Sequence, residues 1–108
     1  MIRWITSHPE YVEFSKCRRS VKSEHFKLLL LPDAQGSAVG ITISKKIANA
    51  VGRNLLKRRI KAWLRASAMI LPENLKMNII AQKGAADLSW QDLCDELEGL
   101  VKCINQQG

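Results

Sequence analysis

The stretch SKKIANAVGRNLLKRRIKAWLR, Ser44–Arg65, concentrates the basic charge of this chain in one segment. Eight of the 17 Lys and Arg residues lie in it, namely Lys45, Lys46, Arg53, Lys57, Arg58, Arg59, Lys61 and Arg65. The nearest acidic residues are Asp33 and Glu73, so residues 34–72 carry a charge of +8. Because the whole chain carries +7, the remaining residues sum to −1. A local cluster of this density is typical of a surface that binds a polyanion.

The apolar residues of this stretch recur with the period of an α-helix. At about 100° per residue, one face of the helix gathers the side chains of Leu56, Ile60, Trp63, Ser67 and Ile70. The opposite face carries Asn54, Arg58, Lys61 and Arg65, with Lys57 on its flank and Arg53 nearer the apolar edge. An ordinary solvated helix face is the alternative, but such a face normally holds acidic partners at i,i+4 spacing, and this one holds none. The pattern therefore favours a nucleic-acid contact.

Length and composition indicate one domain, and the basic helix together with the family resemblance described below leads us to expect a single RNA-binding domain over residues 1–108. The chain is 46 % hydrophobic, which suits a folded globular protein, and 108 residues leave no room for two independent cores. The longest apolar run, Leu28–Leu31, is far shorter than a membrane helix, and the N-terminus lacks the apolar core of a signal peptide. We therefore expect a cytoplasmic protein with no membrane partner. The spacing of Cys17, Cys94 and Cys103 suggests neither a disulfide framework nor a zinc site.

Periodicity and turn residues predict six elements in the order helix, strand, strand, helix, strand, helix. They are a helix from a Thr6 or Ser7 cap to about Cys17, a strand Glu24–Leu31, a strand Ala38–Ile43, the basic helix starting between Lys46 and Ala50 and ending before Pro72, a strand Leu75–Gln82, and a helix from a Ser89 cap to about Ile104. We expect the first two strands to pair with each other in antiparallel fashion. The predicted fold class is α+β, a small two-layer α/β sandwich with helices packed on one sheet.

The chain shows no catalytic centre of its own. Its two histidines, His8 and His25, have no nucleophile and carboxylate at a recognisable spacing. A metal-dependent nuclease would cluster Asp and Glu residues, which are scattered here. No glycine-rich phosphate loop of the P-loop or Rossmann type is present. We therefore predict no catalytic residue and no metal ligand in this chain.

The segment Ile47–Lys61, IANAVGRNLLKRRIK, resembles the protein subunit of bacterial ribonuclease P. The positions that carry this resemblance are Ile47, Ala50, Arg53, Asn54, Leu56, Lys57, Arg58, Ile60 and Lys61. Similarity extends outward to VGITISKK at Val39–Lys46, RSVKSEHFKLLLLP at Arg19–Pro32 and GAADLSWQDL at Gly84–Leu93. It therefore covers nearly the whole chain.

The resemblance implies a specific fold and activity. The implied fold is the sandwich of the second domain of ribosomal protein S5, with the basic helix in a left-handed β-α-β crossover. The implied activity is endonucleolytic removal of the 5′ leader of precursor tRNA, which gives the mature 5′ end. In this family a catalytic RNA and its bound Mg²⁺ ions perform the chemistry. The implied partners are ribonuclease P RNA and precursor tRNA, and we expect a monomer that binds the RNA one to one.

The resemblance also implies two binding sites. The RNA-binding residues would be Lys45, Lys46, Arg53, Asn54, Lys57, Arg58, Lys61 and Arg65, although Asn54 could instead cap a neighbouring loop. Arg59 lies on the Leu56 side, so we expect it in a structural or rim position. The cleft for the single-stranded leader would hold Tyr11, Phe14, Arg18, His25 and Lys27. Ser15 and His25 stand where the family often has aromatic residues, and Tyr11 and Phe14 could instead simply pack the helix on the sheet.

Three other functions are compatible with a basic helix. The chain could be a non-enzymatic, ribosomal-type RNA-binding protein of similar fold, although the Arg-Asn-x-x-Lys-Arg pattern favours ribonuclease P. It could be a DNA-binding domain that places the helix in the major groove. It could also use the helix on a membrane surface, which would require an exposed apolar face.

Overall fold

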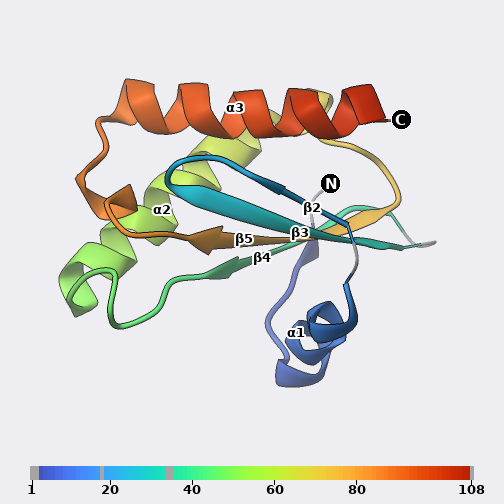
Figure 1. Cartoon of the computed structure of the whole chain (residues 1–108), viewed down its shortest axis with the longest axis horizontal. Coiled ribbons are helices and arrows are strands. Elements are labelled where there is room, and N and C mark those ends of the chain that lie inside the picture. Colours follow the sequence, from blue (N-terminus) through green and yellow to red (C-terminus); the bar gives the residue numbers. More distant parts are fainter. Residues whose placement is uncertain (1–2, 18, 34–35, 108) are drawn as a thin grey trace.

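The computed structural model describes residues 3–17, 19–33 and 36–107. Eleven elements follow one another (Figure 1): β1 (Arg3–Trp4), α1 (His8–Glu13), the 3₁₀ turn η1 (Phe14–Lys16), β2 (Arg19–Lys22), β3 (Phe26–Pro32), β4 (Ala38–Thr42), α2 (Ala50–Ala66), the 3₁₀ turn η2 (Ala68–Ile70), β5 (Leu75–Ala81), the 3₁₀ turn η3 (Ala85–Asp87) and α3 (Trp90–Gln107). The six predicted elements and their order are confirmed. The strands β1 and β2 were not predicted, since two and four residues are too short to show a period.

The strands form one sheet in the order β1-β4-β5-β3-β2. The predicted antiparallel pairing of β3 with β4 was wrong, because β5 lies between them. β5 pairs with β3 in antiparallel fashion, which places Ile79 opposite Leu28, and with β4 in parallel fashion, which places Ile79 opposite Ile41. Three consecutive residues of β5, Met77, Asn78 and Ile79, are buried, as expected for a central strand that is covered on both faces.

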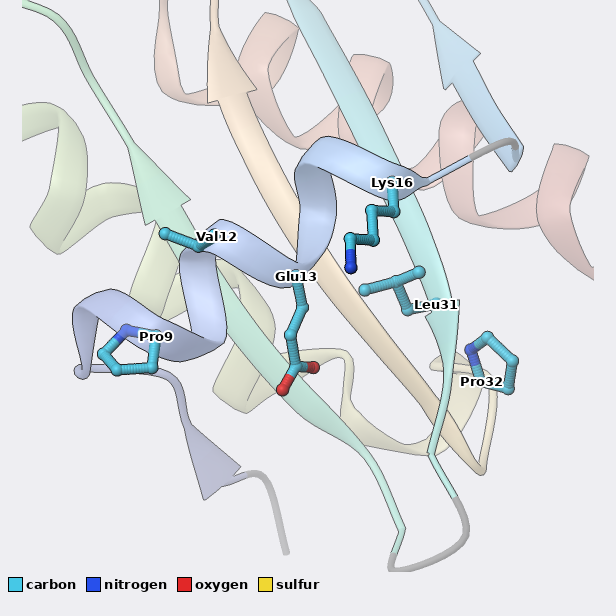
Figure 2. Close-up of a pocket in the computed structure, with 6 residues that line it drawn as sticks. All are labelled: Pro9, Val12, Glu13, Lys16, Leu31 and Pro32. Carbon is cyan, nitrogen blue, oxygen red and sulfur yellow. The ribbon is translucent and has the colours of Figure 1, made fainter.

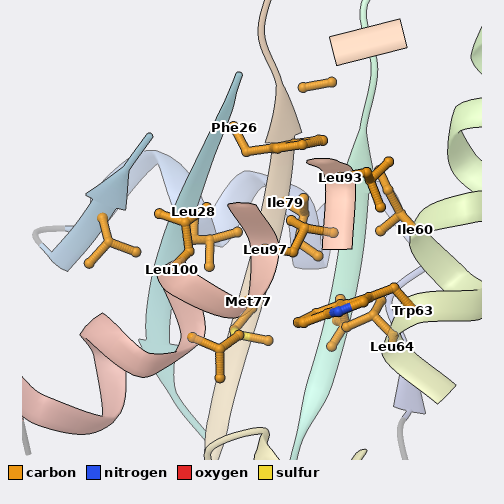
Figure 3. Close-up of a cluster of buried hydrophobic side chains, with 14 of the residues drawn as sticks. Phe26, Leu28, Ile60, Trp63, Leu64, Met77, Ile79, Leu93, Leu97 and Leu100 are labelled. Atoms are coloured by element: carbon orange, nitrogen blue, oxygen red, sulfur yellow. The ribbon is translucent and has the colours of Figure 1, made fainter. Parts of the chain in front are cut away.

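The connection from β4 through α2 to β5 is a left-handed crossover. Figure 3 views the sheet from the side of α2 and α3; with β5 pointing upward, the parallel strand β4 lies to its right. The chain therefore moves leftward on the near face of the sheet as it passes through α2. This hand is the one that the family resemblance implies, and it departs from the usual right-handed rule.

Helices cover both faces of the sheet. α2 and α3 lie on one face and α1 lies on the other (Figure 1). The larger core fills the space under α2 and α3 (Figure 3), and its buried side chains include Phe26, Leu28, Leu30, Met77, Ile79, Leu56, Ile60, Trp63, Leu64, Leu93, Leu97 and Leu100. A smaller core of Ile5, Phe14 and Ala38 lies under α1. The side chains of β3 alternate between these two cores, as the period of a strand requires.

Candidate nucleic-acid interface

A side-chain cap fixes the start of α2. The side chain of Asn49 accepts a hydrogen bond from the Gly52 N–H through Oδ1 at 2.8 Å. The guanidinium of Arg53 reaches back and donates to the carbonyl of Ala48 at 2.9 Å. No acidic residue stands in the first turn, so the partial positive charge of the helix N-terminus adds to that of the neighbouring cations.

The two predicted faces of α2 are present in the structure. Leu56, Ile60, Trp63 and Leu64 are buried against the sheet and α3. One part of the wheel was wrong: Ile70 is 40 % exposed, because α2 ends at Ala66 and Ile70 lies in η2. Because Leu56, Ile60 and Trp63 are buried, α2 does not expose the apolar face that a membrane-surface helix would require.

The opposite side of α2, with its edge, carries five cations, which we call the basic face: Arg53, Lys57, Arg58, Lys61 and Arg65. Lys57, Arg58 and Arg65 are exposed, while Arg53 and Lys61 are half-buried at its edges. Every ion pair formed by Lys or Arg among the described residues involves other cations, Arg3, Lys76 and Lys102. The repulsion among the cations of the basic face is thus not offset by carboxylates, as expected for a surface that binds an anionic partner.

A polar hollow of 180 Å³ lies where α2 meets the end of β4. It is lined by Ile41, Ile43, Arg53, Asn54 and Lys57. Asn54 is exposed in this hollow and caps no loop of the described residues. These groups place two cations and an amide around a space that suits a phosphate or the edge of a base.

Lys45 and Lys46 lie in the turn between β4 and α2, and in the sequence they fall between Ile43 and Arg53, which both line this hollow. Both are exposed. The Ser44 carbonyl accepts from the Ile47 N–H at 3.1 Å, and Ser44 Oγ accepts from the Lys46 N–H at 3.0 Å. The turn therefore presents two cations next to the N-terminal end of the basic face.

Arg59 has the structural position expected for it. Its guanidinium donates to the Leu88 carbonyl at 3.2 Å and ties α2 to the segment that precedes α3. Trp4, by contrast, was missed at the sequence level. Its ring lies under Lys61, with 5.0 Å between Nζ and the ring centroid.

Tyr11 docks α1 on the sheet. Its hydroxyl donates to the Ile5 carbonyl at 3.1 Å and accepts from the Ile41 N–H at 3.2 Å. Its ring lies against Gly40, where an added Cβ would stand 2.7 Å from Tyr11 Cε1. One edge of the ring is therefore engaged in packing.

The other residues predicted for the leader cleft do not lie together in the structure. Phe14 is buried in the smaller core, which is the packing alternative considered for it. Lys27 is half-buried and alternates with Phe26 and Leu28, so it lies on the α1 face of the sheet. Arg18 lies outside the described residues.

The placement of His25 in the cleft was wrong. His25 precedes β3, and its Nδ1 lies 2.8 Å from Glu96 Oε1 of α3, on the opposite face of the sheet from α1. Glu96 also accepts from the His25 N–H and from the Ser23 hydroxyl. The alternation that put His25 beside Lys27 does not apply, because the strand begins at Phe26.

This contact shifts both side-chain pKa values. The hydrogen bond to Glu96 raises the pKa of His25 against an opposing effect of burial. Burial raises the pKa of Glu96, but hydrogen bonds from Ser23 and His25 outweigh it and leave the pKa lowered. The pair thus adds stability when His25 is protonated and Glu96 is ionised.

A groove of 360 Å³ runs between α1 and the end of β3 (Figure 2). Pro9, Val12, Glu13, Lys16, Leu31 and Pro32 line it, and Lys16 extends alongside Leu31. Most of these residues carried no signal in the sequence, since single apolar residues in turns and helix ends have no diagnostic pattern.

Ion pairs tie α1 to the sheet beside this groove. Lys76 Nζ lies 3.0 Å from Glu13 Oε2 and 3.5 Å from Glu10 Oε2. Arg3 pairs with Glu10 at 2.9 Å, and this hydrogen bond lowers the pKa of Glu10. The carboxylates on α1 are therefore matched by cations of β1 and β5.

Within residues 3–17, 19–33 and 36–107, no three His, Cys, Asp or Glu side chains gather at metal-binding distance. None of the helices formed by those residues combines the length and hydropathy that a membrane crossing requires.

Known proteins resemble this chain in sequence. A family model described as Ribonuclease P matches residues 3–105. The ribonuclease P protein component of Geobacter sp. (strain M21) is 40 % identical over 92 residues, which are 82 % of this chain and 77 % of that protein. The corresponding component of Geotalea uraniireducens (strain Rf4) is 33 % identical over 100 residues, which are 90 % of this chain and 86 % of that protein.

Solved structures share the fold. The RNase P protein of Staphylococcus aureus has a TM-score of 0.85 at 24 % identity, over 94 % of each chain. That of Thermotoga maritima has a TM-score of 0.79 at 22 % identity, over 88 % of this chain and 90 % of the other.

Proposed function

The chain belongs to the ribonuclease P protein family, and we propose that it binds the RNA subunit of ribonuclease P through the basic face of α2. As part of that endoribonuclease, it assists removal of the 5′ leader from precursor tRNA. The observation that supports this proposal most strongly is the basic face itself. Its five cations lie on one side of a 17-residue helix, and no described carboxylate pairs with them.

The contact would be made mainly to phosphates. A helix of 17 residues is about 25 Å long, which lets its basic face reach several successive phosphates. Arg58 and Arg65 would bind them through planar forks, and Lys57 and Lys61 as point charges. Arg53 and Asn54 at the hollow would add contacts in the first turns of α2. Lys45 and Lys46 would extend this surface beyond the N-terminus of the helix.

We place the catalytic centre in the RNA. The His, Cys, Asp and Glu side chains of the described residues do not gather into a metal site. Mg²⁺ ions would therefore be bound mainly by the RNA, whose phosphate oxygens are ligands that this ion prefers. The protein would contribute charge compensation and orientation of the two RNAs.

The leader of precursor tRNA would lie on the α1 face of the sheet. The groove lined by Val12, Lys16 and Leu31 offers apolar surface beside a cation, and Lys27 adds a second cation on this face. Phe14 offers no ring for stacking because it is buried, whereas Tyr11 is half-buried and keeps part of its ring accessible. Phosphate contact and apolar contact together are the usual means of holding single-stranded RNA.

The proposed assembly is one protein monomer on one RNA, acting in the cytoplasm on precursor tRNA. Reconstitution tests it: a bacterial ribonuclease P RNA transcript and a precursor tRNA are mixed at low Mg²⁺ with and without the protein. A large gain in cleavage at the mature 5′ end is expected, because the protein's cations replace part of the metal-ion screening of the RNAs. If cleavage is the same with and without the protein, the proposal is refuted.

A further inference from the structure

The ring of Trp4 forms a contact with the basic face that the RNA-binding role does not by itself require. Trp4 lies in β1, which pairs with β4, and it is packed half-buried against the larger core. Lys61 projects from the C-terminal half of α2, and its Nζ stands 5.0 Å from the Trp4 ring centroid. This distance is within the range of about 6 Å over which a cation is attracted to an aromatic face.

Lys61 differs from neighbouring cations in what holds it. Arg53 and Arg59 donate hydrogen bonds to backbone carbonyls of Ala48 and Leu88. Lys61 has no carboxylate at ion-pair distance among the described residues, and the aromatic ring is the partner the structure gives it. A carboxylate would neutralise the ammonium, whereas a ring attracts it and leaves its net charge and outward N–H donors for another anion.

We propose that Trp4 is a positioning residue that holds Lys61 in place for an RNA phosphate. The proposal rests on the proposed function, since it assigns a task to Trp4 within the same interface. A free lysine side chain loses rotamer entropy when it binds a phosphate. The ring fixes part of that side chain beforehand, so less entropy is lost on binding. The strand β1 thus serves the RNA interface, although it lies outside α2.

The test compares two substitutions of Trp4 in the presence and absence of the lysine charge. Trp4→Leu removes the aromatic face and keeps an apolar side chain, whereas Trp4→Phe keeps a face. Each is made in the wild-type chain and in Lys61→Met, and the affinity for a bacterial ribonuclease P RNA transcript is measured over a range of salt concentrations. The resonances of the Lys61 side chain are followed by NMR in the free protein.

Trp4→Leu should weaken RNA binding about two- to fivefold when Lys61 is present, which corresponds to about 0.5–1 kcal/mol for an exposed cation–π contact. It should have no effect in the Lys61→Met background. Lys61→Met should lower the salt slope by about one unit, while Trp4→Leu leaves that slope unchanged, because the phosphate contact still forms. The ring-current shift of Lys61 should disappear in Trp4→Leu and persist in Trp4→Phe.

Equal weakening by Trp4→Leu in both backgrounds would overturn the inference, since Trp4 would then act through folding or by touching RNA itself. The inference would also be overturned if Trp4→Leu did not weaken RNA binding in the wild-type chain, where Lys61 is present. The proposed function would survive either result, because Lys61→Met would still reduce affinity and salt slope. If the wild-type chain fails to bind the transcript, the proposed function fails instead.

Discussion

Gly40 allows α1 to dock on the sheet, and Gly40→Ala tests this directly. A Cβ at this position would stand 2.7 Å from Tyr11 Cε1 and 2.9 Å from the Tyr11 hydroxyl oxygen. The ring cannot move aside freely, because its hydroxyl is bonded to the Ile5 carbonyl and the Ile41 N–H. The clash must therefore shift α1 or break these bonds.

The expected loss of stability is about 0.5–2 kcal/mol. Overpacking costs about 1–3 kcal/mol, and replacing a glycine returns about 0.5–1 kcal/mol through the unfolded chain. For a domain of this size, the melting temperature should fall by roughly 4–8 °C per kcal/mol. Urea unfolding followed by tryptophan fluorescence measures the change in free energy. Gly99→Ala on α3 is the matched control, because a Cβ there meets no atom within 4 Å and should stabilise the helix.

A double-mutant cycle separates the clash from other effects. In a Tyr11→Ala background the space over Gly40 is open, so Gly40→Ala should be neutral or stabilising. In the wild-type background it should also reduce the preference for precursor over mature tRNA while sparing affinity for ribonuclease P RNA, since only the α1 side is disturbed. The reasoning is refuted if Gly40→Ala is as stable as the wild type, or if its cost is the same without the Tyr11 ring.

Three further perturbations probe other parts of the molecule. Arg58→Ala should weaken binding to ribonuclease P RNA and lower the salt slope by about one unit, whereas Lys102→Ala on α3 should change neither; equal effects would argue against a localised interface. His25→Gln should lower unfolding stability by about 0.5–1 kcal/mol near pH 5.5 and by less at pH 8.5. Because the pKa of His25 is raised in the folded protein, its contact with Glu96 stabilises the fold fully at pH values below the ordinary His pKa of about 6.5. This stabilisation is lost as the pH rises through the raised pKa. At strongly acidic pH the stabilisation is lost again, because Glu96, whose pKa is lowered, becomes protonated. If the stability difference between the wild type and His25→Gln stays constant from pH 5 to 9, the ion pair of His25 with Glu96 is contradicted. Lys27→Ala should weaken binding of precursor tRNA more than mature tRNA, and an equal loss for both would remove Lys27 from the leader site.

Helical periodicity predicted α2 well, because its apolar and charged residues are set by one local geometry. Leu56, Ile60 and Trp63 are buried as the wheel indicates, and Arg58 lies on the exposed side. The basic face was therefore visible in the sequence. Trp4 was not, because its contact with Lys61 depends on β1 pairing with β4, which no local pattern encodes.

The pairing of strands and the α1 face were harder to predict for the same reason. The strand alternation of β3 identifies its two faces, yet it gives no information about which strand lies beside it; β5 takes that place from a distant part of the chain. His25 shows the related limit, since one residue before the strand the alternation no longer holds and Glu96 of α3 determines where the ring points. Phe14 shows that a helical aromatic residue can belong to a core as readily as to a binding cleft.

We propose that the basic face of α2 binds the RNA subunit of ribonuclease P. The most direct measurement is precursor tRNA cleavage by reconstituted ribonuclease P as a function of Mg²⁺, with the wild-type chain and with the triple variant Lys57→Gln, Arg58→Gln and Arg65→Gln. These three side chains are exposed, so the variant should fold normally. We predict that the wild type restores cleavage at low Mg²⁺ and that the triple variant requires more protein and more Mg²⁺. A triple variant that restores cleavage as well as the wild type would contradict the claim.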